Sequence, residues 1–342
     1  MSKKVNFLID GVQVTASPEE TIWDVAKRIG NNIPTLCHFP SFGYRPDGNC
    51  RVCMVEVNGE RALAASCNRK PEEGMEVSTA SERAKAARSM VLELLMADQV
   101  AGARDDGPDN ELWTLAREMG QFGSRFSGTR VECDDSSHPG ILVNLKACIH
   151  CTRCVRACRE VQGNDVIGMA HRGAGNTIIF DVQNPLGESS CVGCGECVQA
   201  CPTGALMEAA LVDQYGVGRQ LQTQDVDSVC PYCGVGCQVT FHVKDDAIQR
   251  VEGRDGPANE NRLCVKGRFG FDYPRHPHRL TTPLIRKDDV PKHGDDSVDP
   301  ANPFTHFREA TWQEALDLAA GGFKSILDSD GSSALAGFGS AK

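Results

Sequence analysis

The chain has 342 residues, of which 40% are hydrophobic and 24% charged, as expected for a globular protein of two or more domains. A net charge of -10 argues against a nucleic-acid partner, because phosphate contacts need basic patches. The sequence contains neither an apolar run that would span a bilayer nor an export leader, so we expect no membrane span and a cytoplasmic location. Seventeen cysteines in such a chain indicate metal ligands rather than disulfides.

The first domain is expected over residues 1–78. Residues 5–14 predict a β-hairpin that turns at Asp10-Gly11, and residues 21–29 predict an amphipathic helix that ends at Gly30. The apolar face of this helix would contain Ile22, Val25 and Ile29. A hairpin, a helix and then a loop of cysteines is the element order of a β-grasp ferredoxin.

Four cysteines follow that helix with the spacing C-x12-C-x2-C-x13-C: Cys37, Cys50, Cys53 and Cys67. A structural zinc is an alternative ligand, because a single C-x2-C pair is a weak signal. The spacing resembles the [2Fe–2S] domain that begins the large iron–sulfur subunit of respiratory complex I and of related hydrogenases and formate dehydrogenases. This resemblance implies that the four cysteines bind a [2Fe–2S] cluster.

Residues 79–140 are expected to form a helical linker. A capping box at Thr79-Ala-Ser-Glu82 predicts a helix over residues 84–96, and residues 111–116 predict a second helix. The apolar face of the first helix would contain Ala87, Val91, Leu94 and Leu95.

In the families named above, the first linker helix leads into a His-x3-Cys-x2-Cys-x5-Cys site that holds another [4Fe–4S] cube. This chain lacks that histidine and the three cysteines, and Asp98 stands where the histidine would be. We therefore expect this site to be lost and residues 104–110 to form a polar, solvated loop. Cys133, a lone cysteine, and His138, which precedes a proline, are not expected to be cluster ligands.

Residues 141–210 contain the motif C-x2-C-x2-C-x3-C twice, at 148–158 and at 191–201, where Pro202 follows. Three thiolates at this spacing can bind one [4Fe–4S] cube, while the following helix carries the fourth to the other cube. One cube would be bound by Cys148, Cys151, Cys154 and Cys201, and the other by Cys191, Cys194, Cys197 and Cys158. Zinc or disulfides suit two crossed quartets less well. The remaining expected elements are strands at 141–144 and 177–180 and the end of the repeat at 203–206.

A polar stretch at 211–227 predicts a domain boundary. Beyond it, the pattern C-x2-C-x3-C and one later cysteine form a further set: Cys230, Cys233, Cys237 and Cys264. Within this set, residues 239–243 and 248–251 alternate in polarity and predict a β-hairpin that turns at 244–247. Zinc is again the alternative ligand on spacing alone.

Residues 264–271 and 276–285 resemble the start of the molybdenum/tungsten bis-pterin oxidoreductases, and the run Arg279-Leu-Thr-Thr-Pro is most similar to formate dehydrogenase α-subunits. The resemblance implies a [4Fe–4S] domain over residues 223–285, in which the set that begins at Cys230 binds a cube. It also implies that Lys266 lies between this cube and the nearer pterin and helps electrons to pass. An exposed loop lysine is the alternative for Lys266.

Residues 286–342 would begin the pterin-binding α/β domain. A capping box at Thr311-Trp-Gln-Glu314 predicts a helix over 312–327, and residues 333–342 predict a strand that enters a glycine-rich turn. In the family this turn cradles the pterin phosphates, which implicates Gly337 and Gly339, although a lone Gly-x-Gly is weak evidence. The family's catalytic metal ligand would lie beyond Lys342, so no catalytic residue is expected within this chain.

The sequence as a whole predicts an α+β multidomain chain that resembles the N-terminal part of the α-subunit of a cytosolic, NAD-dependent formate dehydrogenase. The resemblance implies one [2Fe–2S] cluster, three [4Fe–4S] clusters, and molybdenum or tungsten held by bis-(molybdopterin guanine dinucleotide). Formate would be oxidised to CO2, and electrons would leave toward a flavin/NAD-binding β-subunit and a small [2Fe–2S] γ-subunit resembling complex I peripheral-arm subunits. The alternatives are a complex I large iron–sulfur subunit, an iron-only hydrogenase and a stand-alone iron–sulfur electron carrier.

Overall fold

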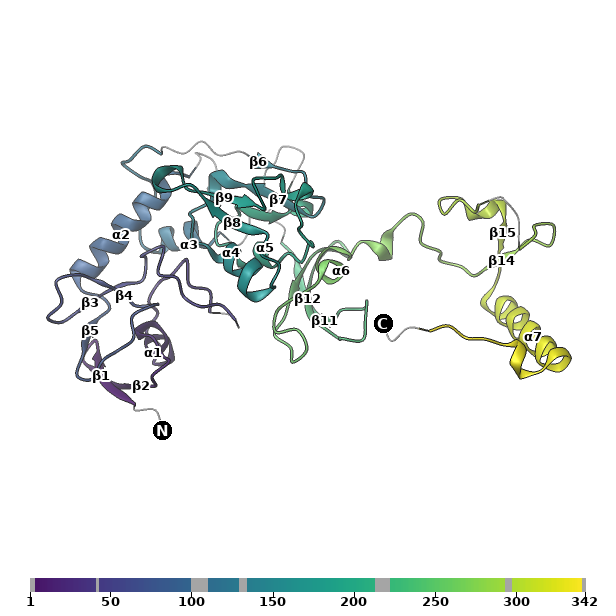
Figure 1. Ribbon diagram of the computed structural model, residues 1–342, viewed down its shortest axis with the longest axis horizontal. Helices are drawn as coiled ribbons and strands as arrows, with labels where there is room; N and C mark the ends of the chain where they lie inside the picture. The colour runs from purple at the N-terminus through teal and green to yellow at the C-terminus, as the bar shows by residue number, and fades with distance from the viewer. Residues whose placement is uncertain are drawn as a thin grey trace. The chain divides into compact units, whose positions relative to one another are not determined.

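The computed structural model describes residues 4–40, 43–99, 110–128, 134–212, 222–292 and 297–339 (Figure 1). The chain divides into two compact units, residues 1–230 with 235–269 and residues 231–234 with 270–342. Both units combine helices with small sheets, so the fold belongs to the mixed α+β class that the sequence predicts. Within the described ranges, no helix is both long and apolar enough to cross a membrane.

The N-terminal part of the first unit is a five-stranded sheet covered by one helix. Its elements are β1 (Val5–Ile9), β2 (Val12–Ala16), α1 (Ile22–Arg28), β3 (Met54–Val57), β4 (Ala64–Ala65) and β5 (Glu76–Ser78). The strand order is β2-β1-β5-β3-β4, in which β1 and β5 are parallel. The predicted hairpin is confirmed: β1 and β2 pair in antiparallel fashion, and Asp10 and Gly11 turn with φ of 47° and 82°.

Helix α1 begins with a capping box and ends before Ile29. The Thr21 amide donates to Asp24 Oδ2 at 2.9 Å, while the Thr21 hydroxyl accepts from the Asp24 amide at 3.2 Å. Ile22 and Val25 are fully buried against the sheet, as predicted. The prediction that Ile29 shares their face is wrong, since Ile29 is 39% exposed. The helical rotation ends at Arg28, so the side chain of Ile29 no longer follows it.

The linker contains α2 (Glu82–Ala97) and α3 (Glu111–Glu118). The predicted capping box of α2 is wrong, because Ser81 and not Thr79 is the N-cap. Thr79 instead donates its amide, at 2.7 Å, and its hydroxyl, at 2.5 Å, to the Asp10 carboxylate. Thr79 therefore binds Asp10 of the β1–β2 turn instead of capping α2.

The apolar face predicted for α2 is confirmed in part, because Val91 and Leu95 pack against the apolar cluster around Leu92. Leu94 is 48% exposed, and the side chains that the helix buries are Ala84, Arg88, Leu92, Glu93 and Met96. In Figure 1, α2 runs beside β3, and Arg88 donates to the Met54 carbonyl at 2.9 Å. This contact with the sheet orients the helix, because a buried guanidinium needs an acceptor.

The next part of the first unit contains two small sheets and two short helices around the doubled cysteine motif. The sheets are β10-β7-β6 and β8-β9, and the predicted strands at 141–144 and 177–180 are confirmed as β7 and β9. The bounds are β6 (Asp134–Asp135), β7 (Ile141–Asn144), α4 (Arg153–Arg156), β8 (Ile167–Ala170), β9 (Thr177–Phe180), α5 (Glu196–Ala200) and β10 (Leu206–Glu208). Helix α4 continues as a π-helical turn over Ala157–Val161. The core between the sheets is apolar and includes Ile141, Ile178, Phe180 and Leu186.

The first unit ends with a three-stranded antiparallel sheet in the order β11-β12-β13, followed by a short helix. The bounds are β11 (Gln224–Val229), β12 (Gln238–Lys244), β13 (Ala247–Gly253) and α6 (Val265–Phe269). Strands β12 and β13 confirm the predicted hairpin. Strand β11 was not predicted, because its polar sequence Gln-Asp-Val-Asp-Ser-Val falls in the stretch assigned to a domain boundary.

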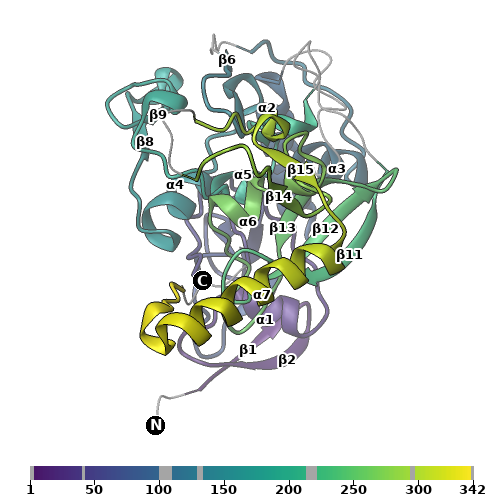
Figure 2. The ribbon, with the colours of Figure 1, turned by 90° about the vertical axis from the view of Figure 1, so that its right-hand side faces the viewer.

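The second unit contains β14 (Leu284–Arg286), β15 (Phe307–Glu309) and α7 (Trp312–Asp330), a helix drawn along its length in Figure 2. Thr311 caps α7 by accepting a hydrogen bond from the Glu314 amide at 3.2 Å, as the sequence predicts. The predicted strand after α7 is wrong for the described residues: Ser332–Ala334 form a 3-10 turn, and residues 335–339 form no strand. A strand needs a hydrogen-bonding neighbour, and none pairs with this segment in the described part of the chain.

Candidate metal centres

The first predicted quartet gathers in the interior of the N-terminal domain. Cys37, Cys53 and Cys67 are completely buried, and Cys50 is 6% exposed. The Cys37 amide donates to Cys50 Sγ at 3.3 Å, and the sulfurs of Cys53 and Cys67 lie 3.4 Å apart. The intervening loop supplies amide donors because it is irregular, with Gly48 and Arg51 at φ of 66° and 60°.

Contacts among these four thiols change their acidity. Hydrogen bonds with Cys50 and Cys67 lower the pKa of the Cys37 thiol, and a hydrogen bond with Cys67 lowers the pKa of Cys53. The same contacts raise the pKa of Cys50 and Cys67. Four buried cysteine sulfurs that contact one another in this way are the donor set that an iron–sulfur cluster needs. The residues present therefore fit a cluster of the [2Fe–2S] kind.

The cysteines of the predicted first cube line one cavity. Its wall contains Cys148, Cys151, Cys154 and Cys201 together with apolar side chains such as Leu145, Ile149 and Ile178. Burial raises the pKa of Cys154, and the nearby thiols of Cys148, Cys151 and Cys201 raise it further. The fourth cysteine in this group comes from the other run, as crossed ligation requires.

The other run has the reciprocal arrangement. Burial raises the pKa of Cys197, and the thiols of Cys194, Cys191 and Cys158 raise it further. Amides turn toward sulfur in both runs: the Val166 amide donates to Cys158 Sγ at 3.2 Å and the Gly193 amide to Cys191 Sγ at 3.4 Å. Such N–H···S bonds and burial are what set the potentials of iron–sulfur clusters. The two crossed quartets therefore fit two cubes.

Three cysteines of the last predicted set belong to the first unit. Cys230 is buried, and its amide donates to the Cys237 carbonyl at 2.8 Å. Cys237 and Cys264 line an open cleft of about 490 Å³ together with Cys194. Cys233 belongs to the second unit. Ligation of a cube by all four remains a prediction.

The residues assigned to electron passage and pterin binding are exposed. Lys266 lies on α6, two residues after Cys264, and its side chain is solvent-exposed. Gly337 and Gly339 are exposed in the second unit. Their proposed roles remain predictions.

The region of the lost site is partly described. Asp98 is the C-cap of α2, whereas residues 100–109 and Cys133 lie outside the described residues. Asn110, expected in a solvated loop, is 7% exposed; it caps α3 and donates to the Thr203 carbonyl at 3.2 Å. His138 lies in a loop, as predicted, where its Nδ1 accepts from the amides of Gly140 and Ile141 at 3.1 Å.

Three buried arginines around the cysteine loops were not predicted: Arg153, Arg156 and Arg268, each 1–2% exposed. Arg153 forms a two-pronged ion pair with Glu111 at 2.6 and 2.8 Å and donates to the His38 carbonyl at 3.2 Å. An arginine inside a sequence motif is exposed by default, so only tertiary structure reveals such burial.

Arg268, on α6, reaches the second cysteine run. Its guanidinium donates to Gln199 Oε1 at 2.6 Å, to the Val251 carbonyl at 3.2 Å and to the Cys194 carbonyl at 3.4 Å. This side chain joins the second run to the β11–β13 sheet.

All cysteines in the described part of the chain are free thiols. In that same part, no three His, Cys, Asp or Glu side chains converge on a single metal ion. The candidate ligands are cysteine thiols, most of them buried or half-buried, and such sulfur-only donor sets suit iron–sulfur clusters.

Comparisons with known families agree with this donor chemistry. Residues 2–82 match a 2Fe-2S iron-sulfur cluster binding domain, and residues 138–207 match the ferredoxin-like domain of NADH-quinone oxidoreductase subunit 3. Residues 223–276 match the molybdopterin oxidoreductase Fe4S4 domain. These three matches identify the chain as an iron–sulfur, electron-transfer part of an oxidoreductase subunit.

Similar proteins match most of the chain. NADPH-Fe(3+) oxidoreductase subunit alpha of Geobacter sulfurreducens is 32% identical over 98% of this chain and 37% of its own length. An NADH-quinone oxidoreductase subunit of Rhizobium meliloti is 33% identical over 83% of this chain and 33% of its own. A putative formate dehydrogenase of Staphylococcus haemolyticus is 28% identical over 100% of this chain and 37% of its own.

A solved structure, that of an NAD+-reducing [NiFe]-hydrogenase in the H2-reduced state, matches with a TM-score of 0.56 and 29% identity. The match covers 60% of this chain and 88% of the hydrogenase chain. The chain belongs to the family that includes the NADH-quinone oxidoreductase subunit of Rhizobium meliloti and putative formate dehydrogenases. Its members are recognised by their 2Fe-2S and molybdopterin-oxidoreductase Fe4S4 domains. It spans about a third of the length of these curated relatives.

Proposed function

We propose that this chain is the electron-relay portion of a cytosolic formate dehydrogenase. Formate would be oxidised to CO2 at a molybdenum or tungsten bis-(molybdopterin guanine dinucleotide) centre held by further parts of the subunit. Four clusters would carry the electrons: one [2Fe–2S] at the Cys37 set and three [4Fe–4S] at the Cys148, Cys191 and Cys230 sets. The partners would be a flavin/NAD-binding subunit and a small [2Fe–2S] subunit.

The observation that carries the proposal is the crossed grouping of the eight cysteines in the doubled motif, followed by a molybdopterin-type Fe4S4 domain. A crossed pair of quartets suits a two-cube relay, and the following domain would connect it to a pterin centre. Formate is favoured as substrate because a putative formate dehydrogenase matches the whole chain and because the Arg279-Leu-Thr-Thr-Pro run resembles that family.

The chain's own residues would hold and tune the clusters rather than perform bond chemistry. When bound, the clusters supply one-electron storage. The buried cysteines provide thiolates, the loop amides donate to sulfur, and the apolar walls around Leu145, Ile149 and Ile178 keep water away. Lys266 would lie on the electron route at the pterin side.

The first test is iron and acid-labile sulfide in the full-length subunit, purified without oxygen, with EPR of its reduced state. After subtraction of any cluster beyond residue 342, we expect about fourteen irons from one [2Fe–2S] and three [4Fe–4S] clusters. About eighteen irons would show that the linker still holds a cube, and about ten that one quartet is empty or holds zinc.

A second candidate function is the oxidation of a reduced nicotinamide by a complex that feeds electrons inward through this chain. Two relatives favour it, the NADPH-Fe(3+) oxidoreductase subunit and the NADH-quinone oxidoreductase subunit. Stopped-flow reduction of the isolated full-length subunit separates the two proposals. Formate alone should reduce the clusters of a formate dehydrogenase subunit, whereas clusters that respond only to NADH or NADPH in the presence of a flavin subunit would favour the second candidate.

A further inference from the structure

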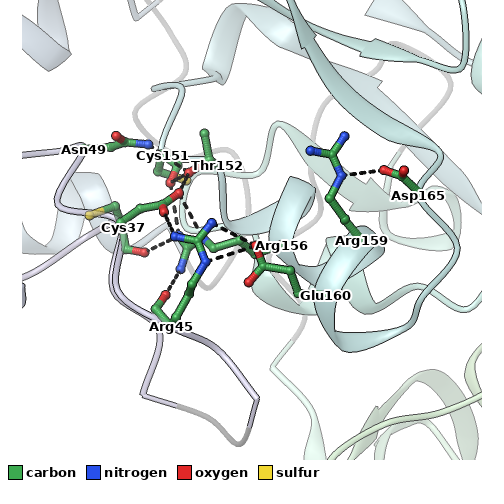
Figure 3. Close-up of polar contacts among 10 residues, drawn as sticks. Cys37, Arg45, Asn49, Cys151, Thr152, Arg156, Arg159, Glu160 and Asp165 are labelled. Carbon is green, nitrogen blue, oxygen red and sulfur yellow. Dashed lines mark hydrogen bonds and ion pairs between the residues drawn. The ribbon is translucent and has the colours of Figure 1, made fainter. Parts of the chain in front are cut away.

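One buried guanidinium joins the loop of the first predicted cube to the loop of the predicted [2Fe–2S] cluster. Arg156 lies on α4, between Cys154 and Cys158, and is 1% exposed. Its Nη2 donates to the Cys37 carbonyl at 2.6 Å and to the Cys151 carbonyl at 3.2 Å (Figure 3). A single nitrogen atom therefore contacts one predicted ligand residue of each cluster.

The same guanidinium is tied to the N-terminal domain on its other side. Nη1 donates to the Arg45 carbonyl, and Nε lies 3.2 Å from Asp47 Oδ2 as an ion pair. Asp47 Oδ2 also accepts from the Thr152 hydroxyl at 2.5 Å, and Thr152 in turn accepts from Asn49 Nδ2 at 2.9 Å. The loop that carries Cys37 and Cys50 is thus fastened to the loop that carries Cys151.

The charge of Arg156 is little screened by water because its side chain is buried. In the low-dielectric interior a cation stabilises nearby negative charge much more strongly than at the surface. A cluster becomes more negative when it accepts an electron, so a neighbouring cation raises its reduction potential. Asp47, which faces the Nε edge of the guanidinium, offsets part of this effect.

We propose that Arg156 is a positioning residue shared by the [2Fe–2S] cluster and the first cube. It holds their two loops in register and raises the reduction potential of both clusters together, while Asp47 limits that rise. The second run has Gln199 at the matching position, so its cube lacks an equivalent shared cation on its own helix. The inference rests on the proposed function, because it requires clusters at both quartets.

The test is an EPR-monitored redox titration of the full-length subunit in four forms: wild type, Arg156→Met, Asp47→Asn and Arg159→Met. Arg156→Met should lower the potentials of the [2Fe–2S] cluster and the first cube, with a tenfold fall in the reduced-to-oxidised ratio as the expected scale, about 59 mV for a one-electron couple. Asp47→Asn should raise both, because the guanidinium loses its counter-charge. The second cube, bound by the Cys191 set, should shift least and serves as an internal reference.

Arg159→Met is the matched control. Arg159 follows Arg156 by three residues, but it is exposed and pairs with Asp165 at 2.5 Å (Figure 3). Its removal deletes the same charge, which water already screens, so the potentials should stay near those of the wild type. Arg156→Lys keeps the charge without the planar fork and should restore most of the potential.

The outcomes distinguish a failure of the inference about Arg156 from a failure of the proposed function. Shifts of opposite sign in Arg156→Met and Asp47→Asn support the inference, since a purely structural role would disturb both variants in the same direction. If Arg156→Met does not assemble, Asp47→Asn is the deciding variant. Raised potentials of the [2Fe–2S] cluster and the first cube would support the inference, and unchanged potentials would overturn it. Unchanged potentials, or equal shifts in all the clusters, overturn the inference. Absence of the [2Fe–2S] or cube signals from the wild type would instead overturn the proposed function.

Discussion

The two halves of the cysteine repeat share left-handed turns before the third cysteine but have different electrostatic surroundings. Each half places two residues at positive φ, at matching positions before the third cysteine. They are His150 and Thr152 in the first half, with φ of 51° and 61°, and Gly193 and Gly195 in the second, with φ of 65° and 70°. The sulfur spacing demands this conformation, which explains why one half uses glycine and the other accepts the strain of larger residues.

The halves differ in their buried charges. The first half carries Arg153 and Arg156 on its own helix, whereas the second has Glu196 and Gln199 at those positions. Glu196 is 2% exposed and accepts from the Tyr44 hydroxyl at 2.9 Å, and the guanidinium nearby comes from Arg268 on another element. The motif therefore sets the sulfur geometry, while the surrounding residues set the local charge and with it the potentials of bound clusters.

The strongest test of the comparison is the crossing of the fourth ligand. Cys158→Ser should abolish the EPR signal that Cys191→Ser abolishes, and Cys201→Ser the signal lost in Cys148→Ser, because each fourth cysteine serves the other half. Each variant should lose about four irons. If Cys158→Ser instead removed the same signal as Cys148→Ser, the halves would be independent and the crossed assignment wrong.

The second half should also make stability depend on pH. Burial raises the pKa of Glu208, at the end of β10, to about 7, and its Oε2 has no hydrogen-bond partner in the described residues. Between its unfolded value of 4.5 and about 7, the folded state keeps a proton that the unfolded state has lost. Stability is therefore fully present below pH 4.5 and falls as pH rises to about 7. Strand β8 of the first half has no titratable residue, so that strand adds no comparable dependence of stability on pH.

Glu208→Gln should remove this loss, which is on the order of 3 kcal/mol between pH 4.5 and about 7. Thermal unfolding of the anaerobic protein across that range measures it. Glu188→Gln, a substitution at an exposed carboxylate, is the control and should keep the wild-type slope. Equal slopes in Glu208→Gln and the wild type would contradict the assignment.

The buried Arg153 of the first half is neutralised by Glu111, the first residue of α3 in the linker. Glu111→Leu leaves that guanidinium with only carbonyl acceptors, those of His38 and Ala200. We expect a loss of about 2 kcal/mol, less than for a fully buried pair because Glu111 is 43% exposed. Urea unfolding followed by cluster absorbance measures the change. Glu118→Leu, at an exposed position of the same helix, is the control, and an equally small loss in both variants would show that the pair contributes little.

The last test concerns the left-handed turns that the halves share. Gly195→Ala should cost about 1–2 kcal/mol from the left-handed conformation, with a further cost because its Cβ would lie 2.8 Å from Arg268 Cγ. Gly11→Ala, at φ of 82° with open space around it, isolates the backbone cost. The two melting temperatures should differ, with Gly195→Ala lower. Equal values would show that Arg268 yields easily.

Local patterns predicted the elements whose signals agree with their surroundings. The β1–β2 turn at Asp10-Gly11, the β12–β13 hairpin and the Thr311 cap all appear where their residues predict them. The patterns failed where a distant partner intervened. Asp10 takes the hydroxyl of Thr79 away from the helix cap, and polar β11 forms because β12 offers it a ladder of hydrogen bonds.

The cysteine sets could be predicted from the chain alone, since ligand spacing is a local property and the doubled motif already predicts a crossed arrangement. The charges beside those sets became apparent only from the folded chain. Arg153, Arg156 and Arg268 resemble ordinary surface arginines in the sequence, yet each is buried by carbonyl and carboxylate acceptors from distant segments. Burial of a charge depends on partners that converge from far along the chain, and no local pattern encodes that convergence.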